Sequence, residues 1–205
     1  MDKLEYENKH IKNGAQYIAG VDEVGRGPLA GPVVCCAVIM PLDDLIDGID
    51  DSKKLSPTKR EKLAAEIQKK ALAYKIVEID QTEIDRINIL NAVKKGMEEA
   101  VCGLSLKPNV TLVDGNDTHL NINAEYVVKG DAKSYTIGCA SIVAKVYRDA
   151  LMVKYAEEFP EYGFEKHKGY GTKAHIEAIK EKGPCRLHRK TFIKNFWDGQ
   201  EKTSR

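Results

Sequence analysis

The sequence predicts one domain of the α/β class, and three observations support this prediction. Short apolar runs typical of strands alternate along the chain with segments whose apolar residues recur at helical spacing. The length of 205 residues suits a single domain. The composition, 42% hydrophobic and 31% charged, is that of a folded protein. We expect one domain over residues 1–205, with a core over about residues 17–160 and a basic helical part over about 161–205.

The first elements are two strands and a helix. Residues 17–24 and 31–40 are apolar runs separated by a turn rich in Gly and Pro, which predicts adjacent strands. An acidic loop follows. Ser56 before Pro57 has the order of an N-cap and a first-turn proline, so we expect a helix from there to about residue 72.

The middle of the chain alternates strand, helix, strand and strand. Residues 73–80 have a strand-like pattern, and residues 82–104 place apolar side chains at helical spacing, which predicts one long helix. Pro108 precedes the short apolar run 110–113, which predicts a buried strand, and residues 125–128 predict another.

The last third is expected to be helical. Residues 140–159 form an amphipathic pattern, and the loop 160–171 holds several Gly and aromatic residues. Thr172 is placed to cap a further helix, which Gly183 would end.

Charge is distributed unevenly although the net charge is only +1. Residues 41–51 carry five Asp and no Lys or Arg, whereas residues 165–194 carry nine Lys or Arg against three Glu. A basic C-terminal third is compatible with a polyanionic partner, although solvated basic helices also have this composition.

The five cysteines indicate reduced thiols in a cytoplasmic protein. Their number is odd and none forms a C-x-x-C pair. Cys35 and Cys36 are neighbours in a strand-like run, so their side chains should point to opposite faces of the sheet. A polar N-terminus and the lack of a long apolar run argue against a secretory signal and a membrane span.

Acidic residues follow three of the predicted strands, as Asp22-Glu23, Asp114 and Asp131. Sites in α/β sheets often lie where strands end, so these carboxylates are expected to converge. Clustered carboxylates repel one another and are most easily retained around divalent cations such as Mg²⁺ or Mn²⁺. The alternative is solvated surface charge.

The segment after Glu23 has a pattern of its own. Adjacent residues on a regular strand face opposite ways, so Asp22 and Glu23 serve one site only if the strand ends or bulges there. Gly25 and Gly27 allow such a change and a close approach of the backbone to a ligand, while Arg26 between them suits a phosphate.

These motifs, taken together and in order, resemble the ribonuclease HII family over residues 17–196. The matching pieces are Gly20–Pro28 (GVDEVGRGP), Asp51–Leu55 (DSKKL), Asn88–Leu90 (NIL), Asp114–Asn116 (DGN), Lys129–Asp131 (KGD), Ala140–Val146 (ASIVAKV), Arg148-Asp149 and His167–Thr172 (HKGYGT). One such piece is a weak signal, but this many in one order is highly specific.

The resemblance implies a ribonuclease-H-like fold with a mixed central sheet, flanking helices and a helical C-terminal part. It also implies a metal-dependent endoribonuclease, expected as a cytoplasmic monomer, in which two Mn²⁺ or Mg²⁺ ions are bound by four carboxylates. These are Asp22, Glu23, Asp114 and Asp131. A contact with a replication clamp or polymerase, and the choice between the two ions, stay open at this point.

The substrates implied are RNA–DNA hybrids and duplex DNA with single ribonucleotides. Cleavage 5′ of the ribonucleotide would leave a 3′-hydroxyl and a 5′-phosphate, which suits ribonucleotide excision repair. In the family the Gly25-Arg26-Gly27 turn recognises the 2′-hydroxyl and the tyrosine matched by Tyr170 stacks on the sugar at the junction. Ser52, Lys53 and Lys54 are expected to contact the duplex.

Three rival interpretations of the sequence remain. Ribonuclease HIII has an N-terminal platform, for which the 16 or so residues before the first strand leave no room. A nucleic-acid-binding module would hold the carboxylates as structural groups only. A metal phosphatase for small substrates fits the basic C-terminal third poorly.

Some motif residues have structural explanations. Ser141 could cap the predicted helix or contact a phosphate. Arg148 and Asp149 are expected to form an internal ion pair. Cys185 and His188 lie too close in one loop to suggest a zinc site. Residues 198–205 match no motif.

Overall fold

The computed structural model describes residues 3–116 and 118–197 and confirms the α/β class. A five-stranded sheet has the order β3-β2-β1-β4-β5. Its strands are β1 (Ile18–Val24), β2 (Val33–Ile39), β3 (Ala73–Ile79), β4 (Val110–Asp114) and β5 (Ala124–Val127). β1 pairs antiparallel with β2 and parallel with β4, so the sheet is mixed. A mixed central sheet is what the family resemblance implies.

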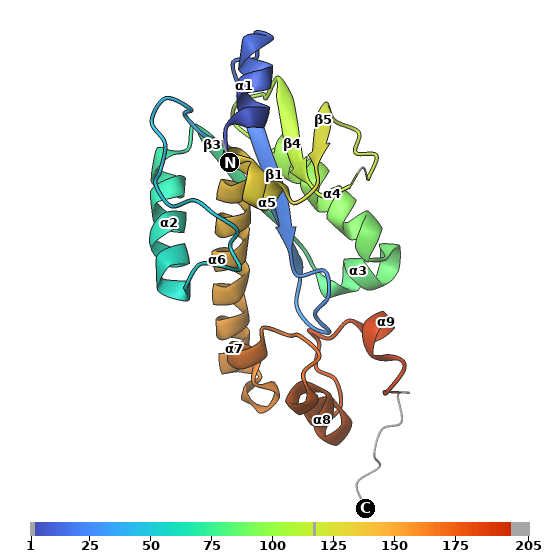
Figure 1. Ribbon diagram of the computed structural model, residues 1–205. Helices are drawn as coiled ribbons and strands as arrows, with labels where there is room; N and C mark the ends of the chain where they lie inside the picture. Colours follow the sequence, from blue (N-terminus) through green and yellow to red (C-terminus); the bar gives the residue numbers. More distant parts are fainter. Residues whose placement is uncertain (1–2, 117, 198–205) are drawn as a thin grey trace, which may run out of the picture.

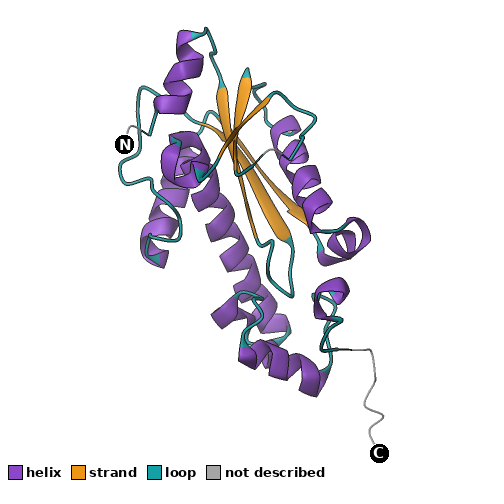
Figure 2. Cartoon of the chain, turned by 45° about the vertical axis from the view of Figure 1, so that its right-hand side comes forward, coloured by secondary structure: helices purple, strands orange, loops and turns teal. Residues whose placement is uncertain are grey.

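Helices cover both faces of the sheet (Figures 1 and 2). They are α1 (Glu5–Lys12), α2 (Pro57–Lys70), α3 (Gln81–Ile87), α4 (Ile89–Cys102), α5 (Gly130–Lys133), α6 (Tyr135–Glu158), α7 (Phe164–His167), α8 (Lys173–Lys182) and α9 (Lys190–Ile193), with a 3₁₀ turn at Pro160–Tyr162. α2 and α6 lie on one face and α3 and α4 on the other, while α7, α8 and α9 gather beyond the end of β1. None of the helices in the described ranges combines the length and apolarity needed to span a membrane.

Two apolar layers enclose the sheet. Alternate residues of β2 divide between them: Cys36 packs in the layer of α2 and α6, and Cys35 packs in the layer of α4. The Cys35 thiol lies 3.7 Å from the carbonyl oxygen of Val93 in α4. The prediction of opposite faces is therefore confirmed, and all five cysteines are free thiols.

The single helix predicted over residues 82–104 is wrong, because the chain turns at Asn88 and forms α3 and α4 instead. Asn88 has a positive φ of 68°, a conformation that Asn adopts more readily than most residues. Its side chain accepts a hydrogen bond from the Asn91 amide at 3.1 Å, which caps α4. The apolar spacing continues through the break, so periodicity alone did not reveal it.

The helix predicted from residue 140 begins five residues earlier, at Tyr135. Ser134 caps it by accepting from the Ile137 amide at 3.2 Å. Glu7 of α1, a helix that the sequence analysis did not predict, accepts hydrogen bonds from the Thr136 amide at 3.0 Å and the Ser134 hydroxyl at 2.6 Å. A carboxylate at a helix N-terminus stabilises it. Ser141 lies inside α6, so the alternative that it caps the helix is wrong.

The C-terminal segment packs around the second half of α6. Met152 of α6 belongs to one apolar cluster with Phe164 and Ile179. The start of α9 is tied to α3, because the Asp85 carboxylate accepts from the backbone amides of Lys190 and Thr191 at 2.7 and 3.0 Å. Residues 198–205, which matched no motif, lie outside the described residues.

Gly20 brings α6 directly onto the central strand. A β-carbon at this position would overlap the carbonyl carbon of Thr136 and the backbone nitrogen of Ile137. Only a glycine therefore permits this approach, which places the first turn of α6 against the strand that carries Asp22.

Replacement of Gly20 by Ala is expected to lower the free energy of unfolding by about 1–3 kcal/mol, because backbone atoms cannot move aside as a flexible side chain could. Urea denaturation measures this change. Gly27→Ala is the matched control, since a β-carbon there has its nearest neighbour at 3.7 Å. Equal unfolding free energies for the two variants would contradict the close approach.

Candidate active site

The four predicted carboxylates line one pocket at the ends of β1 and β4. Val21 of β1 pairs with Val113 of β4, so Asp22 and Asp114 follow at neighbouring positions. Asp131 lies in α5, next to Gly130, whose amide donates to Asp114 Oδ1 at 2.6 Å. The cavity has a volume of about 320 Å³, and its lining residues are Asp22, Glu23, Val24, Ser52, Lys53, Asp114, Asp131, Ser141, Lys145 and Tyr170.

Asp22 and Glu23 reach the same pocket without a bulge in β1. Pairing with β2 is regular as far as Val24, whereas pairing with β4 stops at Val21. The last residues of β1 are therefore paired with β2 only, and the edge that faces away from β2 is open to the pocket. The Glu23 amide donates to Asp22 Oδ1 at 2.7 Å, so the first carboxylate is held by the backbone of the second.

Burial and like charges disfavour ionisation at the floor of the pocket. Desolvation raises the pKa of Asp22 well above its ordinary value, and the charges of Glu23 and Asp114 add to this, while a hydrogen bond from Ser141 opposes it. Desolvation also raises the pKa of Glu23, although the Arg26 guanidinium, 3.1 Å from Glu23 Oε1, acts against the shift.

Burial and like charges also disfavour ionisation of Asp131. Its pKa is raised first by burial and then by the charges of Asp114 and Asp51, with Lys53 opposing. Lys53 Nζ lies 3.9 Å from Asp131 Oδ2, but the Lys53 side chain is 82% exposed, so its stabilising effect is weak. The pocket thus holds more negative charge than its own cations neutralise.

The donor set fits hard divalent cations. All four groups offer carboxylate oxygens, which Mg²⁺ and Mn²⁺ prefer. Across residues 3–116 and 118–197, no three acidic, His or Cys side chains are already gathered around one point that could hold an ion. Mg²⁺ commonly uses one or two carboxylates and completes its coordination with water and substrate phosphate, so an open arrangement of this kind suits it.

The Gly25-Arg26-Gly27 turn and Tyr170 lie side by side at the rim of the pocket. Gly25 has a φ of 97°, and the position of a β-carbon on Gly27 is 3.7 Å from Cε1 of the Tyr170 ring. The tyrosine is 44% exposed. Its carbonyl oxygen is 2.9 Å from Nδ1 of the buried His175, which fixes the backbone of this loop.

The DSKKL segment contributes two of its three predicted contacts to the pocket. Ser52 is buried, and its Oγ lies 3.1 Å from the Oγ of Ser141. Arg60 of α2 donates to the Ser52 carbonyl at 2.9 Å, which holds the segment in place. Lys53 lines the pocket, whereas Lys54 is exposed and does not line it.

Two residues of α6 also line the pocket: Ser141, for which a phosphate contact was one of two alternatives, and Lys145, for which no site role was predicted. Ser141 and Lys145 are four residues apart and therefore share a helix face. Lys145 Nζ pairs with Asp149 at 2.8 Å. The available signal was one polar residue at each of these positions within the mostly apolar stretch 137–146.

The expected ion pair between Arg148 and Asp149 is wrong. Asp149 pairs with Lys145 instead, and Arg148 turns into the interior, where it is fully buried. Its guanidinium donates to the carbonyl oxygens of Pro32, Ala30 and Lys168 at 2.9, 3.1 and 2.9 Å. Adjacent helical residues point 100° apart, which favours separate partners.

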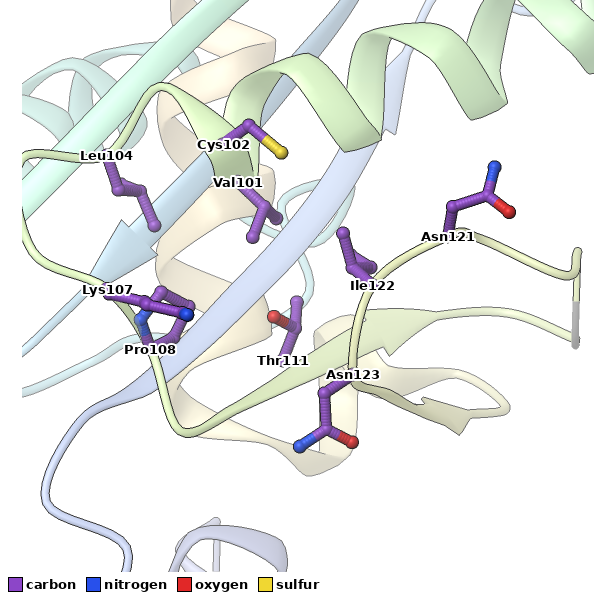
Figure 3. Close-up of a pocket in the computed structure, with 9 residues that line it drawn as sticks. All are labelled: Val101, Cys102, Leu104, Lys107, Pro108, Thr111, Asn121, Ile122 and Asn123. Atoms are coloured by element: carbon purple, nitrogen blue, oxygen red, sulfur yellow. The ribbon is translucent and has the colours of Figure 1, made fainter.

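A second pocket, of about 480 Å³, lies near the opposite end of β4 and contains none of the predicted site residues (Figure 3). Its lining residues are Val101, Cys102, Leu104, Lys107, Pro108, Thr111, Asn121, Ile122 and Asn123. It is larger than the carboxylate pocket but offers no acidic group, so size does not identify the chemical site here.

Known proteins resemble this chain over nearly its whole length. The profile of the family described as Ribonuclease HII matches residues 19–198. A ribonuclease HII of Caldicellulosiruptor saccharolyticus is 52% identical over 194 residues, which cover 94% of this chain and 95% of the relative. A ribonuclease HII of Ruminiclostridium cellulolyticum is 52% identical over 195 residues, which cover 94% and 76%.

Solved structures agree with the sequence relatives. Ribonuclease H2 of Pyrococcus horikoshii superposes with a TM-score of 0.77 at 27% identity, over 89% of this chain and 98% of that one. Ribonuclease HII of Archaeoglobus fulgidus, solved as a complex with PCNA, gives 0.73 at 28% identity, over 84% and 93%. By sequence and by fold, this chain belongs to the ribonuclease HII family of nucleases.

Proposed function

We propose that this enzyme hydrolyses the RNA strand of RNA–DNA hybrids and nicks duplex DNA on the 5′ side of single ribonucleotides, as a step in ribonucleotide removal. One observation carries the proposal: the carboxylate pocket adjoins the Gly25-Arg26-Gly27 turn and the exposed Tyr170 ring. The pocket that would hold the metal ions therefore lies beside a surface suited to a sugar.

The four carboxylates, Asp22, Glu23, Asp114 and Asp131, are the residues that would hold two divalent cations, Mg²⁺ or Mn²⁺. When bound, these ions would lower the pKa of a water molecule and offset the charge that develops on the transferred phosphoryl group. The carboxylates of the chain supply the negative field that attracts the ions, and burial of Asp22 and Glu23 keeps that field from being screened.

Recognition of the ribose would come from the turn and the tyrosine. A 2′-hydroxyl both donates and accepts hydrogen bonds, and it distinguishes RNA from DNA at a given position. The absence of side chains at Gly25 and Gly27 lets the backbone approach that hydroxyl. Tyr170 would stack on the sugar at the junction between ribonucleotide and DNA. Attack of water on the phosphorus 5′ of the ribonucleotide would form a new P–O bond and break the bond to the upstream 3′-oxygen, which leaves a 3′-hydroxyl and a 5′-phosphate.

The duplex backbone would be held by polar and basic side chains around the pocket. Ser52, Lys53 and Lys54 precede α2, and the basic residues of the C-terminal part lie beyond the end of β1. Contacts of this kind position a duplex without selecting its sequence. We further propose a monomer in the cytoplasm, where five free thiols stay reduced.

The function is tested with a labelled DNA duplex that contains one ribonucleotide, incubated with Mg²⁺, with Mn²⁺ and with a chelator. We expect a nick on the 5′ side of the ribonucleotide with either ion and none with the chelator, because oxygen ligands suit both ions. Tight binding to the duplex without a nick would overturn the proposal and favour a binding role for the pocket.

Asp22→Asn should reduce the nicking rate by about a hundredfold or more, because interactions with the metal ions are worth several kcal/mol in the transition state. Affinity for the duplex should stay close to that of the wild type. The variant should also unfold at no lower temperature, since the substitution relieves repulsion with Glu23 and Asp114.

Asp44→Asn is the matched control for this change. Asp44 pairs with Lys70 at 2.8 Å on the surface, outside the pocket, so its loss should leave nicking unchanged. Near-normal turnover of the Asp22 variant would refute its role as a metal ligand.

Tyr170→Ala should lower kcat/KM on the single-ribonucleotide duplex about tenfold more than on a continuous hybrid, because an aromatic stacking contact is worth about 1–3 kcal/mol. Steady-state kinetics on the two substrates measure the difference. Tyr147→Ala serves as the control, since Tyr147 is an exposed tyrosine of α6 that bonds Glu78 and does not line the pocket. Equal losses on both substrates would exclude a role at the junction.

A further inference from the structure

Two arginines are fully buried beneath the Gly25-Arg26-Gly27 turn. Arg148 comes from α6 and Arg189 from the residue before α9. Within the described ranges, neither guanidinium has a carboxylate within 4 Å, and both donate only to backbone carbonyl groups. A buried charge without a directly paired counter-ion is costly, so these two residues need an explanation beyond stability.

Arg189 forms hydrogen bonds with the backbone of the turn itself. Its Nη2 donates to the Gly25 carbonyl at 2.6 Å and its Nη1 to the Arg26 carbonyl at 2.9 Å. Its Nε and Nη2 also donate to the Gly31 carbonyl at 3.0 and 2.8 Å. The rigid fork of one guanidinium therefore closes the loop between residues 25 and 31 from the inside.

These contacts determine where two amide groups point. A trans peptide is planar, and its C=O and N–H bonds lie on opposite sides. A guanidinium that fixes the carbonyl oxygens of Gly25 and Arg26 from the interior therefore turns the N–H groups of Arg26 and Gly27 to the exposed side. No described residue accepts a hydrogen bond from either N–H group.

Arg148 supports the same turn from a second direction. A β-carbon on Gly25 would overlap its Nε, so the guanidinium packs directly under that residue. Arg148 Nη1 also donates to the carbonyl of Lys168, two residues before Tyr170. The turn and the tyrosine loop are thus attached to one buried support.

Burial disfavours the charged form of both arginines. Desolvation lowers the pKa of Arg189 to about 9, and the positive charge of Arg148 adds to the effect. Desolvation likewise lowers the pKa of Arg148 to about 10. Selection for stability alone would favour an apolar residue at such sites, whereas a fork of fixed donors is suited to holding peptide planes in one orientation.

We propose that Arg189 is a positioning residue for recognition of the 2′-hydroxyl. It holds the peptide planes of the turn so that the N–H groups of Arg26 and Gly27 are presented together to the ribose. The inference rests on the proposed function of the turn. It adds that the specificity of the turn is set by a side chain 164 positions after Gly25.

The test compares affinity for two duplexes of one sequence, one with a single ribonucleotide and one entirely of DNA. Both are measured in Mg²⁺ on the Asp22→Asn background, so that cleavage does not interfere. The ratio of the two Kd values isolates the contribution of the 2′-hydroxyl, as in a double-mutant cycle. A role in folding alone would change both affinities and leave the ratio unaltered.

Arg189→Lys keeps the charge but cannot form the fork, so we expect it to reduce the preference for the ribonucleotide by about threefold to tenfold, the equivalent of one hydrogen bond. Arg189→Gln keeps a planar head with two N–H donors and is measured in parallel, in case the lysine variant does not fold. Circular dichroism establishes folding of each variant.

Arg186→Lys is the matched control. Arg186 lies in the same segment, but its guanidinium pairs at 2.7 Å with Glu158 on the surface and does not contact the turn. Its substitution should leave the preference intact. An unchanged ratio in both folded Arg189 variants would overturn the positioning role. No preference in the Asp22→Asn parent would refute instead the proposed recognition of the 2′-hydroxyl.

Discussion

Repulsion among carboxylates at the ends of adjacent strands is the constraint to which the surrounding structure responds. A single cavity is lined by Asp22, Glu23, Asp114 and Asp131. Burial removes much of the solvent that would otherwise weaken the repulsion between their charges. The nearby cations offset this charge only in part: Arg26 pairs with Glu23 at 3.1 Å, but Lys53 is largely exposed and Lys145 already pairs with Asp149. The excess charge is therefore left for a ligand to neutralise, which suits a divalent cation and a substrate that brings phosphate.

A single helix connects this charged pocket to the recognition surface. α6 packs its first turn onto β1 through Gly20, contributes Ser141 and Lys145 to the pocket, and then supplies Arg148 beneath the glycine turn. Asp22 and Glu23 lie within three residues of Gly25 along the chain, and α6 contacts both the pocket and the turn. The proposed metal-binding pocket and the proposed sugar-binding turn are thus packed against the same helix.

The sequence was most informative where the structural cause is local. The alternation of Cys35 and Cys36 follows from the period of a strand, and the position of Asp22 beside Asp114 follows from strand ends meeting at one edge. The predictions were wrong where residues distant in the sequence determine a helix boundary or a side-chain partner. Glu7 extends the start of α6 from more than a hundred residues away, and the partners of Arg148 are carbonyl groups that have no signature in a sequence. Asn88 breaks a helix whose apolar period continues across the break.

The bond from Arg189 to the glycine turn also has a consequence for synthesis of the protein. The turn leaves the ribosome early, together with β1 and β2, whereas its buried support is among the last residues to emerge. Chains fold from the N-terminus as they are made, and contacts between distant positions form late. A nascent or prematurely ended chain thus carries the acidic residues of β1 and β4 but lacks the support of the turn. If the turn recognises the 2′-hydroxyl as proposed, that discrimination would be acquired only when Arg189 has emerged.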